Sequence, residues 1–359
     1  MPGFCGLLRY LHCTYIPYSL RITALCLLFS LLSTTAFCQR TLRRVIAKPG
    51  DGAHTLLHRY GLNSTQQFRR FIELNKKKLA PHNGLLAGRA YLLPAAVPAR
   101  RTASAARPAP THTRTMLQAP LFGPKYARVS VLDHRMRGAV YYLSAGHGGP
   151  DPGAIGHYGS HTLAEDEYAY DVTVRLARVL MQHDATVYVL VQDPNDGIRD
   201  ANILPMDHDE VTFPHQRIPL NQLSRLRQRV TQANKLYAHH KGAYQRLLAL
   251  HVDSRAKGQN IDVFFYHHAR SQAGQRLAKN IHRVFTARYK RAQPNRVYSG
   301  QVSTRSSLYA VRTSHAPAVF MELGNIQNPQ DQRRFLVADN RQALANWIYE
   351  GLLADYLQR

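Results

Sequence analysis

The feature that most constrains this chain is an apolar run that ends in a glycine-rich loop with one histidine. Residues 139–143 read Ala-Val-Tyr-Tyr-Leu, and His147 follows between Gly146 and the pair Gly148-Gly149. A run of β-branched and aromatic residues predicts a buried strand, and glycines let the backbone turn sharply and approach a ligand closely. Open α/β sheets hold their sites at strand ends, so the pattern predicts a functional histidine at such an edge. Taken alone, it also fits an ordinary turn.

Two later apolar runs end in the same way. Residues 247–250 lead into His251, and residues 318–321 lead into Glu322. Between the first run and these two, Glu165 opens a stretch with apolar residues at helical spacing. Two histidines, one carboxylate and a water suit a catalytic zinc ion, which keeps one position open. The pattern therefore predicts one zinc ion, with the remaining carboxylate as a base beside it.

Four separated motifs occur in one order along the last two thirds of the chain. They are Gly146 to Gly149 with Asp151, Gly153, Ala154 and Gly156, then Glu165, then His251, and finally Glu322 to Gly324. Their order and spacing resemble the zinc-dependent N-acetylmuramoyl-L-alanine amidases of the Amidase_3 type. That family has a strand followed by GHGG-x-D-x-GA-x-G, a glutamate that starts the next helix, a strand that ends in histidine, and a late E-x-G.

The resemblance implies hydrolysis of the amide bond between N-acetylmuramic acid and L-alanine of peptidoglycan, in cell-wall remodelling or daughter-cell separation. It implies that His147, Glu165 and His251 bind one Zn²⁺ ion. Glu322 would take the water proton and pass it to the leaving amine. Arg312 is a candidate for holding a substrate carboxylate or the developing oxyanion, and a structural salt bridge is the alternative.

Three positions depart from the family pattern. Ser144 stands where an aspartate commonly precedes the histidine loop, Val252-Asp253 follows the second histidine in place of Ala-Asn, and Asn325 replaces a phenylalanine. The expected ligands remain intact, and Asp253 is a candidate orienting carboxylate. Substrate choice is therefore the property that the motifs leave open.

Other interpretations of the same residues stay open at this point. Glu165 alone fits a first-turn helix carboxylate, and Glu167 is a rival ligand two residues further on. A different zinc hydrolase of wall stem peptides, such as a carboxypeptidase, would use the same groups. A non-catalytic peptidoglycan-binding protein would be expected to lack a ligand, and none is missing.

Strands alternate with helical patterns from about residue 121 to the end, which predicts an α/β catalytic domain over 121–359. Its twisted, mostly parallel sheet would be flanked by helices. The long polar segment 193–219 is either a lid or specificity insertion beside the metal, or a plain surface loop. Its acids and histidines do not have a distinctive cation-binding spacing; they are Asp207, His208, Asp209, Glu210 and His215.

The N-terminal segment has the pattern of a secretory signal over residues 1–38. An apolar run at 22–32 follows basic residues and is short for a membrane span, and small residues predict cleavage before Gln39. A retained membrane anchor is the alternative. All four cysteines lie within this segment, so the mature chain would have neither a disulfide framework nor a thiolate metal site. We expect export to the periplasm or cell envelope, without membrane attachment after cleavage.

Residues 43–95 carry a strand, helix, helix, strand pattern. Its motifs are Lys48 to Asp51, Arg59 to Gly61, Leu74-Asn75 and Ala87 to Pro94. The pattern resembles a LysM domain, which implies binding of glycan that contains N-acetylglucosamine; a packing module without glycan affinity is the alternative. Residues 96–120 are rich in Pro, Ala, Arg and Thr and predict a flexible linker. Such a tether raises the effective substrate concentration at a catalytic domain.

The chain is strongly basic, with 47 Lys and Arg against 22 Asp and Glu and a formal net charge of +25. Basic proteins attract polyanions. The basic residues are scattered and no nucleic-acid motif occurs, so we expect peptidoglycan or another anionic envelope polymer as the partner, and no nucleic acid. An activator protein is a further candidate partner that the sequence cannot name.

Overall fold

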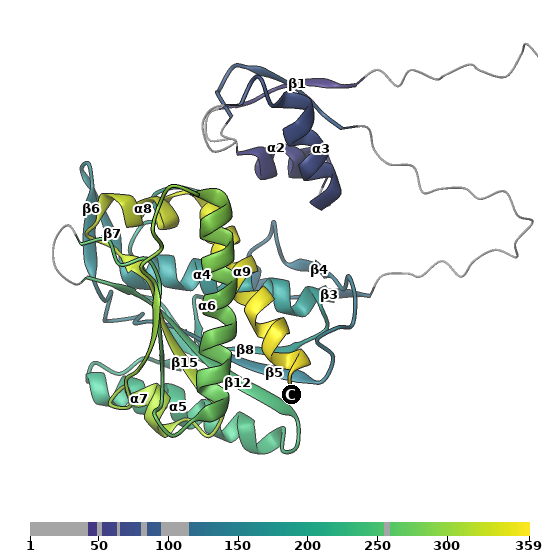
Figure 1. Ribbon diagram of the computed structural model, residues 1–359. Helices are drawn as coiled ribbons and strands as arrows, with labels where there is room; N and C mark the ends of the chain where they lie inside the picture. The colour runs from purple at the N-terminus through teal and green to yellow at the C-terminus, as the bar shows by residue number, and fades with distance from the viewer. Residues whose placement is uncertain (1–41, 49–51, 63–64, 80–84, 95–114, 255–258) are drawn as a thin grey trace, which may run out of the picture.

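A computed structural model describes residues 42–48, 52–62, 65–79, 85–94, 115–254 and 259–359 (Figure 1). The expected signal over 1–38 and most of the expected linker over 96–120 lie outside the described residues. No helix among the described residues is long and apolar enough to span a membrane.

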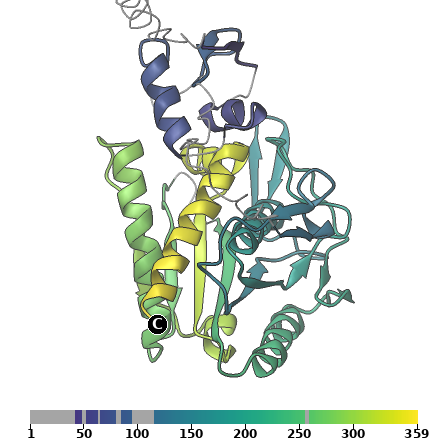
Figure 2. The same cartoon turned by 90° about the vertical axis from the view of Figure 1, so that its right-hand side faces the viewer.

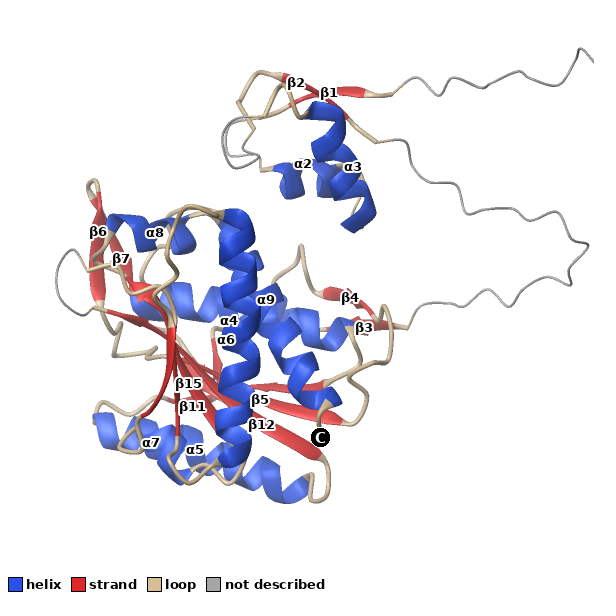
Figure 3. Ribbon diagram, viewed as in Figure 1, coloured by secondary structure: helices blue, strands red, loops and turns tan. Residues whose placement is uncertain are grey.

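The larger part of the structure is built on one six-stranded sheet (Figure 3). Its strands, in spatial order, are β14 (Gln301–Thr304), β13 (Phe264–His267), β15 (Ala318–Asn325), β12 (Tyr244–Asp253), β5 (Ala139–Ala145) and β8 (Thr186–Val189). Within this sheet only the β13–β15 pairing is antiparallel. The prediction of an α/β domain with a mostly parallel sheet is therefore confirmed.

Helices cover both faces of the sheet (Figures 1 and 2). One face packs against α4 (Glu165–Gln182), α6 (Gln272–Ala292) and α9 (Ala338–Leu357), and α8 (Pro329–Leu336) lies beside them. The other face packs against α5 (Gln222–His239), and α7 (Tyr309–Thr313) contacts α5 and β15. Strands buried on both sides read as continuous apolar runs, which is what residues 139–143 and 247–250 show in the sequence.

Side-chain alternation divides the strand residues between these two layers. On β5, Tyr141 and Leu143 belong to the core under α4, whereas Tyr142 belongs to the core under α5. Neighbouring side chains in a strand point to opposite faces, so the register decides which face each functional group joins. His251 of β12 pairs with Glu322 of β15, and these two side chains therefore share one face.

Short elements complete this part of the fold. They are β3 (Met116–Gln118) paired with β4 (Arg128–Ser130), the 3₁₀ turn η2 (Pro120–Phe122), the hairpin of β6 (Ile155–Tyr158) and β7 (His161–Ala164), and a three-stranded sheet of β9 (Val191–Gln192), β10 (Val211–Thr212) and β11 (Gln216–Arg217). The β6–β7 hairpin leads directly into α4, so it connects the histidine loop to the helix that begins with Glu165.

One strand begins later than its apolar run predicts. The sequence indicates a strand from residue 261 to 266, but β13 begins at Phe264. Asp262 has a φ of 54°, in the left-handed region that interrupts an extended strand. Its carboxylate is buried and accepts hydrogen bonds from Arg296, Arg334 and the backbone of Ser299. This local network therefore overrides the apolar pattern.

The N-terminal unit has the expected order of strand, helix, helix and strand. Its elements are β1 (Arg44–Ile46), α2 (Ala53–Arg59), α3 (Thr65–Asn75) and β2 (Ala90–Leu92), and the two strands pair antiparallel. Asn75 ends α3 and binds both backbone groups of Leu92, at 2.8 and 2.9 Å. Residues 49–51 of the first motif lie outside the described residues.

A buried ion-pair network joins α4 to α9. The guanidinium groups of Arg175 and Arg341 each donate from Nε to Oδ2 of Asp171 at 2.6 Å. Asp171 and Arg341 are both fully buried. Arg341 also donates to the carbonyl oxygens of Arg199 and Ala201 at 2.8 and 2.9 Å, so one side chain ties together two helices and the segment that follows β9.

Removing this arginine should destabilise the domain. We expect Arg341→Met to lower the free energy of unfolding by about 3–5 kcal/mol, because Asp171 loses a buried partner. Urea unfolding followed by the fluorescence of Trp347, the only tryptophan in the chain, measures this directly. The control Arg283→Met, at an exposed position of α6, should stay within about 0.5 kcal/mol of wild type. Equal stability of the two variants would contradict the assigned role.

Candidate active site

Glu165 lies where three chain segments meet. It is the first residue of α4, and its carboxylate is buried. Oε2 accepts a hydrogen bond from the amide of Ala154 at 2.9 Å, and Oε1 accepts one from the amide of Val252 at 3.0 Å. The N-terminus of a helix favours negative charge. The backbone thus fixes this carboxylate between the loop after β5 and the end of β12.

The histidine loop holds His147 in an uncommon backbone conformation. His147 has a φ of 60°, a left-handed conformation that few non-glycine residues adopt. Arg229 of α5 donates hydrogen bonds to the carbonyl oxygen of His147 and, at 3.4 Å, to that of Ala145. Burial lowers the pKa of Arg229 to about 10, which leaves it charged at neutral pH. Strained backbone persists where the surroundings hold it in this way.

His251 enters the site from the carboxyl end of β12. Its ring stacks on Phe320, with ring centroids 4.1 Å apart and an interplanar angle of 17°. The strands β5 and β12 are joined just beside it by a hydrogen bond from the amide of Gly146 to the carbonyl of Leu250 at 2.7 Å. Parallel pairing thus brings the two histidine-bearing strand ends to one edge of the sheet.

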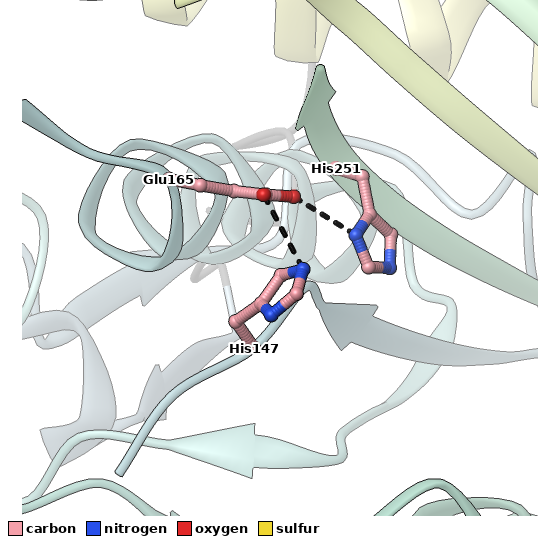
Figure 4. A group of neighbouring side chains, drawn as sticks. All are labelled: His147, Glu165 and His251. Carbon is pink, nitrogen blue, oxygen red and sulfur yellow. Dashed lines mark hydrogen bonds and ion pairs between the residues drawn. The ribbon is translucent and has the colours of Figure 1, made fainter. Parts of the chain in front are cut away.

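The three side chains converge on one point (Figure 4). Nε2 of His147 lies 3.3 Å from Oε2 of Glu165, and Nδ1 of His251 lies 2.9 Å from Oε1. One ligand atom from each residue lies within 4.8 Å of the other two. Figure 4 shows both rings directed at the carboxylate. Two imidazole nitrogens and one carboxylate oxygen are the donor set of a catalytic zinc site.

Two glycines leave the space that this arrangement needs. A Cβ on Gly146 would lie 2.5 Å from Nδ1 of His251, and one on Gly153 would lie 2.7 Å from both Oε2 of Glu165 and the ring of His147. Gly153 also has a φ of 72°. A side chain at either position would displace a member of the cluster, so these glycines are required by the site rather than by the turn alone.

Charge and burial set the protonation of the cluster. The hydrogen bond from Nδ1 of His147, 2.9 Å from Oδ2 of Asp151, holds the pKa of Asp151 well below its usual range. Burial lowers the pKa of His147, but the bond to Asp151 and the charge of Glu165 outweigh burial, so the pKa of His147 is raised. Burial holds the pKa of His251 below its ordinary value. The ionised Asp151 fixes the Nδ1–H tautomer of His147. Nε2 then carries a free lone pair and is the atom that could bind a metal.

Comparison with known proteins agrees with this geometry. The family model described as N-acetylmuramoyl-L-alanine amidase, Amidase_3, matches residues 142–354, which is more than half of the chain and includes all three cluster residues. The chain belongs to this family. This is a family of peptidoglycan amidases. A comparison with curated proteins found no match.

Several solved structures of amidases resemble this family member. AmiC2 of Nostoc punctiforme is 19% identical, with 62% of this chain and 98% of that chain covered and a TM-score of 0.43. The catalytic domain of CwlV from Paenibacillus polymyxa is 19% identical, with 61% and 98% covered and a TM-score of 0.44. CwlD from Clostridioides difficile, solved in complex with the GerS lipoprotein, is 17% identical, with 61% and 99% covered and a TM-score of 0.46.

The two expected catalytic residues of this amidase lie in different surroundings. Glu322 is buried, 8% exposed, and pairs in register with His251. Arg312 lies in α7, is exposed, and has its guanidinium carbon 5.8 Å from the ring centre of Tyr309. Among the described residues no ion pair joins Arg312 to a carboxylate, so the salt-bridge alternative gains no support. Its role in catalysis stays a prediction.

Two rival assignments meet different partners in the amidase. Glu167 forms an ion pair with Arg199 at 2.8 Å and accepts a hydrogen bond from the amide of Asp207 at 2.9 Å. It therefore faces away from the histidines. The backbone carbonyl of Asp253 accepts a hydrogen bond from the amide of Ile326, and its carboxylate stays a predicted orienting group. Oδ2 of Asp151 lies 2.9 Å from Nδ1 of His147, so Asp151 orients this histidine, a role that the sequence pattern does not predict.

The segment 193–219 packs directly on the histidine loop of the amidase. Glu210 accepts a hydrogen bond from the amide of Gly149 at 2.6 Å, and Nδ1 of His208 lies 2.9 Å from the carbonyl oxygen of the same glycine. Leu204 and Ile218 are buried in the main core. Two backbone groups of one loop residue are thus held by this segment. The segment therefore lies beside the predicted metal site and supports the histidine loop, and its role as a lid or specificity insertion stays a prediction.

Acidic side chains of this segment gather behind the histidine loop. Two groups with ligand atoms within 4.8 Å of one another share Asp207: one adds Glu167 and Glu210, the other Asp193 and Asp209. Burial, and then the charges of neighbouring acids, raise the pKa of Asp193 and of Glu210, each to about 7. The sequence does not predict this acidic cluster, because its members come from α4 and from a segment without regular secondary structure and therefore show no regular spacing.

This electrostatic crowding gives a testable pH dependence. Glu210 keeps its proton in the native state up to about pH 7, whereas the unfolded chain releases it near 4.5. The native state therefore binds more protons between these values, and stability falls as pH rises through this window. Glu210→Gln removes the effect and keeps an acceptor for Gly149. We expect the variant to gain about 2–3 kcal/mol on wild type between pH 5 and pH 8, measured by urea unfolding. If the difference in free energy of unfolding between Glu210→Gln and wild type does not change with pH, Glu210 is not the group responsible.

Proposed function

We propose that this protein is a zinc-dependent hydrolase that cleaves the amide bond between N-acetylmuramic acid and L-alanine in peptidoglycan. The observation that carries the proposal is the convergence of His147, Glu165 and His251 on one point at the sheet edge. Membership of the amidase family supports the bond and the substrate. The role would be cell-wall remodelling or daughter-cell separation.

The residues of the cluster fit one Zn²⁺ ion. The ligand atoms of the cluster are two imidazole nitrogens and a carboxylate oxygen. Gly146 and Gly153 have no side chains that would occupy the space around them. His147 would bind through Nε2, because its Nδ1–H donates a hydrogen bond to the carboxylate of Asp151. When bound, zinc lowers the pKa of water from about 15.7 to about 7 and polarises a carbonyl oxygen. An amide needs both effects, because resonance makes its carbonyl a poor electrophile.

Glu322 is the proposed proton carrier. Its register position beside His251, on the shared face of β12 and β15, supports the proposal that its carboxylate reaches a water at the cluster. An ionised carboxylate accepts the proton from this water and delivers it to the nitrogen of the leaving alanine. We propose Arg312, exposed on α7, as a group that holds a carboxylate of the stem peptide; this second role is separate from the proton transfer.

The N-terminal unit would bring the enzyme to its polymer. We propose that residues 43–95 bind glycan that contains N-acetylglucosamine. The part of the expected linker 96–120 that precedes β3 would tether this unit to the catalytic domain, which β3 joins by pairing with β4. The order of β1, α2, α3 and β2 supports this proposal. Export directed by residues 1–38 would place the protein in the periplasm or cell envelope, and the net charge of +25 would favour anionic wall polymers.

Digestion of muropeptides tests the chemistry. Wild type should release intact stem peptides with an N-terminal alanine, identified by mass spectrometry. Glu322→Ala should lose about 10²–10⁴-fold in rate while keeping its zinc, because the proton carrier is removed and the ligands are not. The matched control Glu350→Ala, which removes a carboxylate of α9 paired with Arg288, should keep full activity.

Each alternative has its own signature in the same experiment. Release of lone D-alanine would assign a carboxypeptidase instead. Unaltered turnover in Glu322→Ala would remove this residue from the mechanism, and absence of any product from a zinc-loaded wild type would favour a non-catalytic wall-binding protein.

Metal removal gives a second test. Treatment with a chelator should abolish turnover, and stoichiometric zinc should restore it in wild type. In His147→Ala zinc should not restore it, because two donors hold zinc far more weakly than three. Turnover that survives exhaustive chelation, with metal content verified by elemental analysis, would exclude the zinc mechanism.

A further inference from the structure

We infer that Arg225 is a positioning residue for the metal site, acting through Asp151 on His147. The inference rests on the proposed function, because it concerns the ligand that His147 would supply to zinc. It goes beyond that function by naming a residue outside the family motifs and by linking the metal site to the end of the segment 193–219.

The contact chain is direct. Oδ2 of Asp151 lies 2.9 Å from Nδ1 of His147 and accepts a hydrogen bond from Nη2 of Arg225 at 2.6 Å. Oδ1 of Asp151 accepts a hydrogen bond from the amide of Gly153 at 3.2 Å. A carboxylate held from three sides cannot rotate away from the imidazole. The ring of His147 therefore keeps one tautomer and one orientation, with Nε2 toward Glu165.

Arg225 is itself fixed by the backbone that precedes α5. Its Nη1 donates to the carbonyl oxygens of Leu220 and, at 3.4 Å, of Pro219. Asn221 caps α5 by accepting a hydrogen bond from the amide of Ser224 at 3.0 Å. The side chain of Arg225 is 11% exposed, so water competes little for its donors. Its planar fork bridges a carboxylate and two carbonyls, which the single ammonium of a lysine could reproduce only in part.

The segment 193–219 thus reaches the metal site along two routes. Glu210 and His208 hold Gly149 in the histidine loop, and the carbonyl at its far end, Pro219, helps to anchor Arg225. Mutation of a residue that orients a ligating histidine typically lowers metal affinity 10–100-fold. We therefore expect replacement of Arg225 to lower the affinity for zinc.

Zinc affinity of the full chain, measured by competition with a chromophoric chelator, tests this inference. We expect Arg225→Gln to weaken zinc binding about tenfold, the lower end of the range for outer partners. Arg225→Lys should restore part of this loss, because an ammonium still pairs with Asp151. The matched control Arg227→Gln changes an exposed arginine of the same helix and should bind zinc as wild type does. The metal-free variants should remain fully folded at the temperature of the assay, as judged by far-UV circular dichroism, so that the measured loss is one of zinc affinity.

A double-mutant cycle separates positioning from a general structural effect. In the Asp151→Ala background, Arg225→Gln should cause no further loss of zinc affinity, since the contact that links it to His147 through Asp151 is already gone. An equal loss in both backgrounds would overturn the inference, and so would wild-type zinc affinity in Arg225→Gln. Failure of wild type itself to bind zinc would instead overturn the proposed function, so the two failures are distinguishable.

Discussion

The rest of the site depends on a buried carboxylate at the first residue of a helix. Glu165 satisfies the amides of Ala154 and Val252 while it faces two imidazoles. A buried anion without partners is costly, and here two backbone donors and the N-terminus of α4 stabilise it. The same contacts tie the loop after β5 to the end of β12. One carboxylate therefore both assembles the site and supplies a ligand atom.

Support for the cluster is distributed around it rather than built into the motifs alone. Arg229 holds the backbone of His147 in its left-handed conformation, and Asp151 holds its ring. Phe320 stacks on His251 from the next strand. These partners come from α5, the loop itself and β15, so every layer around the sheet edge contributes. Such rigidity is what a hydrolase needs to keep its donor atoms fixed.

Much of this arrangement could be predicted from the sequence. Continuous apolar runs predicted the buried strands, and parallel strands end at one edge, so His147, His251 and Glu322 were expected to be neighbours. The three ligand candidates meet as expected because parallel strands end at one edge of the sheet and because the start of a helix depends on local sequence. The position of Arg312 was not specified in this way, since α7 is a short exposed helix whose placement depends on Asn234 and other tertiary contacts.

The contacts across long sequence separations could not be predicted. Asp151 and Arg225 are 74 residues apart, and no periodicity links a glycine loop to a helix that follows an irregular segment. The docking of Glu210 on Gly149 is of the same kind. Asp262, whose left-handed conformation delays β13, shows that a buried ion-pair network can override an apolar run. Propensity describes single elements, whereas these features arise only when elements pack.

Anomalous diffraction at the zinc edge, from crystals of the zinc-loaded protein, locates the metal. We expect one strong peak within bonding distance of Nε2 of His147, the carboxylate of Glu165 and the ring of His251. A peak among Glu167, Asp207 and Glu210 instead, or no ordered zinc at the three-residue cluster, would contradict this expectation.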